Sequence, residues 1–318
     1  MLTWATEPVA VRVPATSANL GPGFDSLGLA LTLYDTVRAA VRPTGVEVQV
    51  TGAGAGEVGR GEGHLVVRAM RAAFTTVGAQ PPGLSLDCRN EVPQGFGFGS
   101  SAAAIVAGLL AARELAGEAG AAALGPERLL KLATDIEGHP DNVAACLTGG
   151  LTISWMTATS VKMARLIPLA GLVPVLCVPS EPLATESARL VLPADIPHAH
   201  AAANSARAAL LVAGLTGRPE LLLDATEDFL HQPYRAAAMP GTAALIDRLR
   251  DAGIAAMVSG AGPAVLALTV DGAGPSAADV TRLAREAGAA WRVLPLGVDT
   301  EGARILSGPP GSGQQPST

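Results

Sequence analysis

A glycine-rich segment followed by two serines is the part of the sequence whose residue types are best suited to chemistry. It reads EVPQGFGFGSSAAAIVAG from Glu91, and the alanine-rich run after the serines predicts a helix. Such a segment fits three kinds of site: a Walker A loop, a serine nucleophile on a strand-to-helix turn, or a phosphate cradle of backbone amides. A Walker A loop needs a lysine directly after its last glycine, where this chain has Ser100.

The two remaining alternatives differ in what the serines do. The run GSSAA from Gly99 is close to the Gly-x-Ser-x-Gly pattern of a nucleophile turn, but no strand pattern directly precedes it. In a phosphate cradle, glycines let backbone amides approach the anion, and the helix N-terminus adds unpaired N–H groups and a positive dipole end. A serine there can also bind magnesium. Taken alone, the segment could also be a helix cap without a ligand.

The elements that must position this segment follow an α+β pattern in the first half of the chain. Period-2 apolar runs predict strands, the first of them ended by Pro14, and 3.6-residue spacing predicts helices. The apolar stripe of the helix after the glycine segment is Ile105, Val106, Leu109 and Leu110. Strands are predicted at 9–13, within 32–45, at 46–50, at 84–88 and at 149–154, and helices at 64–77, 100–115 and 126–136.

The second half has the order strand, helix, strand, strand, helix, strand, which suits a ferredoxin-like sandwich. Two apolar runs within 254–270 are hinged at a Gly-Ala-Gly-Pro turn. We expect an N-terminal domain over 1–160 with the glycine loop at 93–103, a C-terminal domain over 161–306, and a disordered tail over 307–318. The boundary is expected between 155 and 170. The other strands are predicted at 173–178 and 289–296, and helices at 204–215, 219–229, 242–250 and 277–288.

Composition narrows the functional class. The chain has 318 residues, 49% hydrophobic and 16% charged, which is typical of a globular protein with one or two domains. A net charge of −6 argues against nucleic acid or an anionic membrane as a partner. The three cysteines form no CxxC pair, which excludes a zinc or disulfide framework of the usual spacing. Without a signal peptide or a 20-residue apolar run, a cytoplasmic protein is expected.

Four motifs occur in a fixed order along the chain: VPATSANLGPGFDSLGLAL from Val13, PQGFGFGSSAA from Pro93, EGHPDN from Glu137 and SGAGP from Ser259. Together they resemble the GHMP kinase superfamily. The first motif, with LATESARLVLP from Leu183 and HQPYR from His231, is similar to the homoserine kinases in particular. The resemblance implies a two-domain GHMP kinase fold, with an N-terminal ribosomal protein S5 domain 2-like half and a C-terminal ferredoxin-like half.

The resemblance also implies an activity, the ATP-dependent phosphorylation of the L-homoserine hydroxyl in threonine biosynthesis, giving O-phospho-L-homoserine and ADP. Ser101 and Glu137 would hold Mg²⁺, for which hydroxyl and carboxylate oxygens are suitable ligands. A homodimer is a further expectation from the family. The residues implied to surround the ATP phosphates are Pro93, Gly95, Gly97, Gly99, Ser100, Ser101 and Ala102.

Homoserine is a zwitterion, so its site needs an anion for the ammonium group and cations for the carboxylate. By resemblance, Asp25 takes the ammonium group, and the planar guanidinium groups of Arg189 and Arg235 take the carboxylate. The SGAGP turn would bring the second domain against the acceptor, so that the active site lies in the cleft between the domains. Further substrate positions implied by the family are Asn19, His139, Thr185 and Gly260.

Asp141 and Asn142 match positions that the superfamily places near the transferred phosphate, and with Ser101 they form the expected catalytic set. We favour Asn142 as the residue that orients the hydroxyl, with Asp141 shaping the local field, over Asp141 as a true base. A loose phosphoryl-transfer transition state requires little early proton removal.

The glycine loop departs from the homoserine kinase pattern at Phe96 and Phe98, where the family usually has a small or basic residue and a leucine. Nucleotide affinity is the property that this difference is expected to affect. Three alternatives stay open: another GHMP-type small-molecule kinase, a catalytically weak nucleotide-binding regulatory homologue, and a serine hydrolase using Ser100 or Ser101. An anion with two arginines favours a zwitterionic acceptor, whereas mevalonate has no ammonium group.

Overall fold

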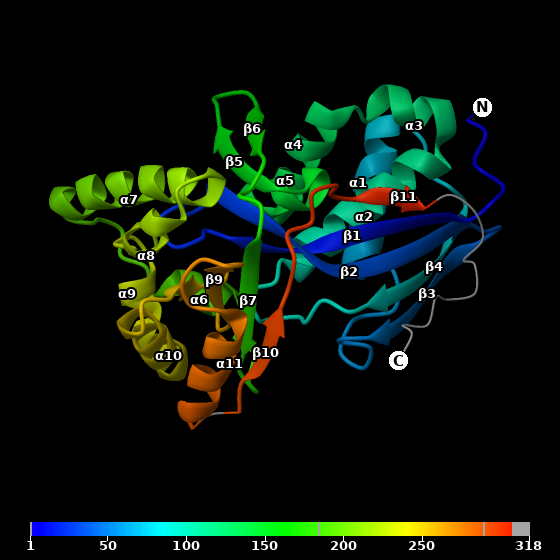
Figure 1. Ribbon diagram of the computed structural model, residues 1–318. Coiled ribbons are helices and arrows are strands. Elements are labelled where there is room, and N and C mark those ends of the chain that lie inside the picture. Colours follow the sequence, from blue (N-terminus) through cyan, green and yellow to red (C-terminus); the bar gives the residue numbers. More distant parts are fainter. Residues whose placement is uncertain (1, 184, 289, 307–318) are drawn as a thin grey trace.

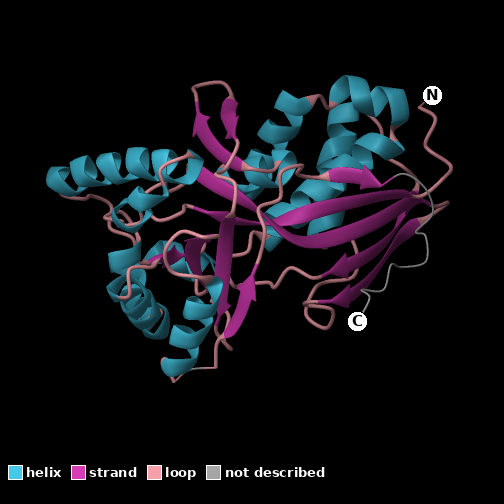
Figure 2. Ribbon diagram, viewed as in Figure 1, coloured by secondary structure: helices cyan, strands magenta, loops and turns pink. Residues whose placement is uncertain are grey.

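The computed structural model describes residues 2–183, 185–288 and 290–306, without the side chains of 185–187 (Figures 1 and 2). The tail expected to be disordered lies outside the described residues. Two β-sheets, each with its own helices, form the molecule, as an α+β chain predicts. Among the described residues, no helix is long and apolar enough to cross a membrane.

The first sheet holds the predicted N-terminal strands. Its path is β11-β1-β2-β4-β3, with β5 paired to β2 and β6 paired to β5, and all pairs are antiparallel except β3 with β4. The strands are β1 (Val9–Ala18), β2 (Leu27–Val41), β3 (Gly45–Gly52), β4 (Gly83–Asn90), β5 (Leu151–Met156), β6 (Val161–Leu166) and β11 (Arg304–Leu306). The helices of this half are α1 (Leu65–Val77), α2 (Ser100–Leu115), α3 (Gly117–Ala123), α4 (Pro126–Glu137) and α5 (Asp141–Thr148).

Two expectations for this half need correction. β1 does not stop at Pro14 but continues to Ala18, because the ladder with β2 shifts register between Pro14 and Ala15, where a proline without an N–H is tolerated. The helix α2 buries more than its expected stripe of large residues. Its many alanines and Gly108 are buried as well, and a Cβ on Gly108 would lie 2.5 Å from the carbonyl oxygen of Val66 in α1.

The second sheet confirms the ferredoxin-like order. Its path is β10-β7-β9-β8 with antiparallel pairing throughout, so the strands lie in the order four, one, three, two. The strands are β7 (Leu172–Val178), β8 (Ala255–Val258), β9 (Val265–Val270) and β10 (Arg292–Pro295). The helices are α6 (Thr185–Leu190), α7 (His198–Thr216), α8 (Leu222–Ala225), α9 (Gln232–Arg235), α10 (Pro240–Asp251) and α11 (Ala277–Glu286), with 3₁₀ turns at Pro219–Leu221 and Ala236–Ala238.

The chain does not divide between the two sheets at residue 160. The expected C-terminal domain began at 161, yet β6 pairs with β5 in the first sheet, and β11 returns from the second half to pair with β1 (Figure 1). The crossing to β7 therefore follows Leu166, inside the expected window of 155–170. In the same half, the expected helix over 219–229 ends at Ala225. A local pattern can predict a strand, but it does not say which sheet the strand joins.

A shared apolar core fixes the two halves against each other. Along β7, Leu172, Leu176 and Val178 join a buried cluster that also contains Leu29 and Phe98 of the first half. The alternate β7 residues pack instead with α10 and α11 on the other face of the sheet. Because side chains alternate between the faces of a strand, this sheet is covered on both sides. One face packs against the first half of the chain, so apolar side chains fill the space between the two halves.

Candidate active site

Groups from both halves of the molecule hold the backbone of the glycine loop before α2. The N–H of Thr16 in β1 donates to the carbonyl of Phe98 (2.9 Å), and the Ser259 hydroxyl donates to the carbonyl of Gly97 (2.7 Å). Gly97 has a left-handed φ of 82°, and a Cβ there would lie 2.0 Å from the carbonyl oxygen of Ser259. Only glycine fits this position. The loop thus leads directly into the N-terminus of α2. The first N–H groups of this helix have no partner within the helix.

A pocket of about 320 Å³ opens at that helix end, between the two halves of the chain. Most of the expected site residues line it, although they come from distant parts of the sequence. Those in the lining are Asn19, Gly95, Gly97, Gly99, Ser100, Ser101, Glu137, His139, Asn142, Arg189, Arg235 and Gly260.

Five expected site residues lie elsewhere. Asp25 and Asp141 stand behind the lining and contact residues in it. Pro93 and Ala102 are buried, so at most their backbone can face a ligand. Thr185 begins α6, but its side chain lies outside the described residues.

A second pocket, of about 310 Å³, lies on the other side of the same helix end. Ser100 and Ser101 line both pockets, while His64 and Asn90 line this one alone. Two cavities that meet at a helix N-terminus offer one space on each side of an anion bound there.

Ser101 and Glu137 meet although they are 36 residues apart. The serine hydroxyl donates to Glu137 Oε1 at 2.5 Å, from the first turn of α2 to the last residue of α4. Burial raises the pKa of the Glu137 carboxyl, while the hydrogen bond from Ser101 acts to lower it. Among the described side chains Glu137 forms no ion pair. A partly buried carboxylate beside a hydroxyl, without a cationic partner, fits a hard divalent cation such as Mg²⁺.

Asp25 and Arg189 form an ion pair with two contacts, of 2.7 Å and 3.3 Å. Asp25 lies in the β1–β2 loop, where Asn19, Leu20 and Asp25 itself all have left-handed φ values between 50° and 64°. Asn19 holds this loop by accepting the N–H of Asp25 (2.9 Å) and donating to the carbonyl of Gly260 (2.8 Å). Three strained residues in one loop mark a conformation that the surroundings enforce.

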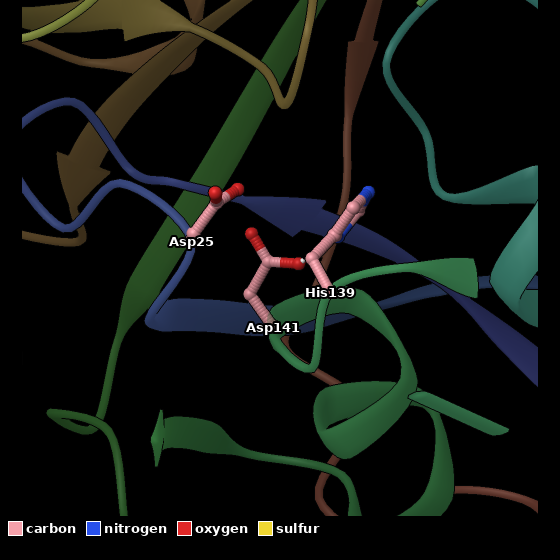
Figure 3. A group of neighbouring side chains, drawn as sticks. All are labelled: Asp25, His139 and Asp141. Atoms are coloured by element: carbon pink, nitrogen blue, oxygen red, sulfur yellow. Dashed lines mark hydrogen bonds and ion pairs between the residues drawn. The ribbon is translucent and has the colours of Figure 1, made fainter. Parts of the chain in front are cut away.

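Asp25, His139 and Asp141 lie together, as Figure 3 shows, and their potential metal-ligand atoms are all within 4.8 Å of one another. Both carboxylates already have partners: Asp25 pairs with Arg189, and Asp141 bonds His139 Nδ1 (2.6 Å) and the N–H of Asn142 (2.8 Å). Burial acts to lower the pKa of His139, but Asp141 and Glu137 more than offset it, so the pKa is raised. The cluster is therefore a weaker candidate for Mg²⁺ than Glu137 with Ser101.

Arg235 is the most unusual charge in the pocket. It is 1% exposed, and its hydrogen bonds run to the carbonyls of Ala188 (2.9 Å) and Gly260 (3.4 Å) and to His231 Nδ1 (3.1 Å). No carboxylate among the described side chains pairs with it. Burial, together with the charge of Arg189, lowers the pKa of Arg235 to about 10, so the guanidinium stays charged at neutral pH. A buried cation without an anion is costly unless a ligand supplies one.

Three residues that were not among the expected site residues complete the site. The Thr16 hydroxyl donates to Asn142 Oδ1 (2.7 Å), and the Ser17 and Ser259 hydroxyls bond across the cleft (2.9 Å). Thr16 and Ser17 lie in the motif VPATSANLGPG, Asn142 in EGHPDN and Ser259 in SGAGP, so the motifs themselves were the signal. Phe96 packs against the apolar core between the halves, in the same cluster as Phe98, and lines neither pocket.

Comparison with known proteins identifies the family of the chain. The family model for the GHMP kinases N terminal domain matches residues 64–150, and that for the GHMP kinases C terminal domain matches 206–293. A homoserine kinase of Streptomyces coelicolor is 53% identical over 298 residues, covering 94% of each chain. One from Leifsonia xyli subsp. xyli is 52% identical, covering 93% of this chain and 91% of its own.

Solved structures give the same result. The crystal structure of homoserine kinase from Cytophaga hutchinsonii has a TM-score of 0.82 at 27% identity, covering 96% of this chain and all of the other. A 4-(cytidine 5'-diphospho)-2C-methyl-D-erythritol kinase shares the fold, with a TM-score of 0.57 at 19% identity, over 90% of this chain and 99% of its own. With relatives this similar over nearly its whole length, the chain belongs to the homoserine kinase family of GHMP kinases.

Proposed function

We propose that the protein transfers the γ-phosphoryl group of ATP to the hydroxyl of L-homoserine, giving O-phospho-L-homoserine and ADP. The observation that carries the proposal is the buried Arg235, a cation without a described carboxylate partner, in the same pocket as an anion-binding helix end. Homoserine offers the carboxylate that this guanidinium lacks. The high identity to homoserine kinases supports the same acceptor.

The nucleotide would occupy the junction of the two pockets. Its phosphates would lie against the glycine loop and the first N–H groups of α2, with the nucleoside in the cavity lined by His64 and Asn90. Ser101 and Glu137 would hold Mg²⁺, which neutralises charge on the phosphates. The packing of Phe96 away from both pockets supports nucleotide binding in spite of the unusual loop.

On binding, the acceptor would replace the ion pair between Asp25 and Arg189 by its own contacts with each of these two residues. Its ammonium group would take Asp25, and its carboxylate would take Arg189 and Arg235, so that every charge stays compensated. His139, Asn19 and the backbone of Gly260 form the walls next to these groups, and Thr185 would complete them. Because two opposite charges must be matched at once, an acceptor with only one of them would bind poorly.

Asn142 is better placed than Asp141 to act on the acceptor hydroxyl. Thr16 fixes the Oδ1 atom of Asn142, while its Nδ2 atom has no hydrogen bond to a described residue and is available to a ligand oxygen. Asp141 is 1% exposed, and Oδ1 of its carboxylate is engaged by His139 and by the Asn142 N–H. Asp141 would therefore shape the field at the site and orient His139, and the loose transition state requires no strong base.

The product, a phosphate ester of homoserine, belongs to threonine biosynthesis, and we place the reaction in the cytoplasm. The three cysteines are unpaired and buried, as is usual in a reducing compartment.

An acceptor panel tests the proposal. ADP release is measured with Mg²⁺-ATP against L-homoserine, mevalonate, galactose, L-threonine and no acceptor, and mass spectrometry identifies any product. Release with homoserine alone, giving O-phosphohomoserine, is the expected result. Release with a different acceptor would show that the protein is a GHMP kinase with another substrate. No release, with ATP still bound, would favour a regulatory nucleotide-binding protein.

A further inference from the structure

The HQPYR motif contains a histidine that the reaction itself does not use. His231 is fully buried at the start of α9, one turn before Arg235. Its ring lies 5.2 Å from the ring of Phe24, and the guanidinium carbon of Arg235 lies 5.7 Å from that same ring. His231 and Arg235 thus share one enclosed space behind the acceptor pocket.

The hydrogen bonds of His231 determine which of its ring nitrogens carries a proton. Arg235 has only donors, so His231 Nδ1, at 3.1 Å from Nη1, must accept. His231 Nε2 lies 2.9 Å from the carbonyl oxygen of Gly21, which can only accept, so Nε2 must carry the proton. The ring is therefore neutral.

Every acceptor that holds the Arg235 guanidinium is uncharged. Two are backbone carbonyls, of Ala188 and Gly260, and His231 is the only described side chain that bonds it. A carboxylate in the place of His231 would fix the guanidinium equally well but would also neutralise it. A neutral imidazole orients the Arg235 guanidinium without neutralising it, so the positive charge of the guanidinium stays available to a ligand.

We propose that neutral His231 is a positioning residue, which orients Arg235 towards the carboxylate of the acceptor and, through Gly21, ties that orientation to the loop carrying Asp25. The proposal rests on the proposed function, because it requires an acceptor with a carboxylate. His231 would thus hold in place both the residue that binds the carboxylate and the loop that binds the ammonium group. Acceptor selectivity then depends on a residue that does not touch the acceptor.

The charged groups around the ring set its pH behaviour. Burial lowers the pKa of His231, and so does the charge of Arg235, whereas Asp228, which lies 3.5 Å from Nε2, and Asp25 act in the opposite direction. In acid, a proton on Nδ1 would replace an acceptor by a donor facing Arg235. The guanidinium would then lose its only side-chain hydrogen bond among the described residues.

Two substitutions separate the two hydrogen bonds of the ring. His231→Asn keeps an acceptor near the Nδ1 position, and His231→Gln keeps a donor near Nε2 but removes the acceptor for Arg235. The matched control is His200→Gln, at an exposed histidine on α7. Kinetics are measured with L-homoserine and with 2-amino-1,4-butanediol, which has the same ammonium and hydroxyl groups but no carboxylate.

For His231→Gln we expect the KM for homoserine to rise roughly 10- to 100-fold, the effect of a hydrogen bond to a charged group. We expect kcat, the KM for ATP and kcat/KM for the aminodiol to stay within about threefold of wild type. His231→Asn should recover most of the homoserine KM. Equal losses with both acceptors, or equal losses in the Asn and Gln variants, would overturn the inference, since a merely structural role predicts them.

A measurement on the unaltered protein covers the case in which the variants do not fold. The ratio of kcat/KM for homoserine to that for the aminodiol should stay constant above pH 6.5 and fall only in more acidic solution, because burial lowers the pKa of His231 from its ordinary value of about 6.5. Changes at the ammonium and hydroxyl sites affect both acceptors alike, so a constant ratio would overturn the inference. If the wild-type protein does not phosphorylate homoserine, the proposed function fails and the inference fails with it. If it does and the ratio is constant, only the inference fails.

Discussion

The two walls of the proposed active site are built in opposite ways. The phosphate wall, formed by residues 93–99 and the first turn of α2, consists of glycines and backbone N–H groups from one continuous segment. The acceptor wall, formed by Asp25, Arg189 and Arg235, consists of charged side chains from three distant segments. Backbone groups suit a phosphate that every ATP molecule carries, whereas side-chain charges can select one zwitterion among many alcohols.

The largest effect is expected at Gly97, where the phosphate wall contacts Ser259 of the second half. In Gly97→Ala the new Cβ would lie 2.0 Å from the carbonyl oxygen of Ser259, and the left-handed φ adds about 1 kcal/mol or more of strain. We expect kcat/KM to fall about a thousandfold or more, because the loop must leave its place. The matched control is Gly95→Ala, where φ is also left-handed but the nearest atom is the Cβ of Pro182 at 3.0 Å. Equal activity of the two variants would contradict the importance of the close contact between Gly97 and Ser259.

A smaller loss, confined to the acceptor, is expected when Asp25 loses its charge. In Asp25→Asn, the ammonium group of homoserine has no anion and Arg189 has lost its partner. We expect the homoserine KM to rise about 100-fold, on the order of 3 kcal/mol, with the KM for ATP nearly unchanged. Steady-state kinetics with each substrate varied in turn would show it. A normal homoserine KM would remove Asp25 from the acceptor wall.

At the phosphate wall, Glu137→Gln should act through magnesium. The amide keeps a hydrogen-bond acceptor for Ser101 but loses the charge that a divalent cation requires. We expect turnover at low Mg²⁺ to fall roughly 10- to 100-fold, with partial recovery at high Mg²⁺. A magnesium titration of the wild type and the variant measures this, and unchanged turnover at low Mg²⁺ would exclude Glu137 as a ligand.

Asp35 provides the smallest effect and a direct contrast with Asp25. It lies behind the phosphate wall, where its carboxylate accepts the N–H groups of Glu91 and Val92, and burial raises its pKa from 3.8 to about 6. Because the pKa is raised, the ionised Asp35 carboxylate lowers the free energy of unfolding above pH 6. This destabilisation disappears as the pH falls from 6 towards 3.8. Asp35→Asn should therefore gain about 1–2 kcal/mol of stability at pH 8 and little at pH 4.5. Denaturant melts at both pH values test this, and a loss of stability at pH 8 would show that the charge itself is needed.

The phosphate wall could be predicted from the sequence because it is local. Glycines, a serine pair and an alanine-rich run are contiguous, and local backbone preferences determine their conformation. The helix starting at Ser100 and the strands near the loop were confirmed for the same reason. The resemblance to homoserine kinases supplied the acceptor residues, but not how they pair.

What could not be predicted depends on contacts between distant segments. The Asp25–Arg189 pair joins residues 164 positions apart, and the contact between His231 and Gly21 spans 210 positions. No periodicity reports such distances. The three-residue strand β11 is likewise too short to show a pattern, and it exists because β1 offers it a free edge.

We expect the two walls to bind their ligands independently of each other, and the variant Arg235→Ala tests this. The dissociation constants of Mg²⁺-ATP and of L-homoserine are measured separately by calorimetry on the wild type and the variant. We predict that homoserine binds about 100-fold or more weakly, on the order of 3 kcal/mol, while Mg²⁺-ATP binds within about threefold of wild type. Unchanged homoserine binding, or an equal loss for both ligands, would contradict the assignment of Arg235 to the acceptor wall.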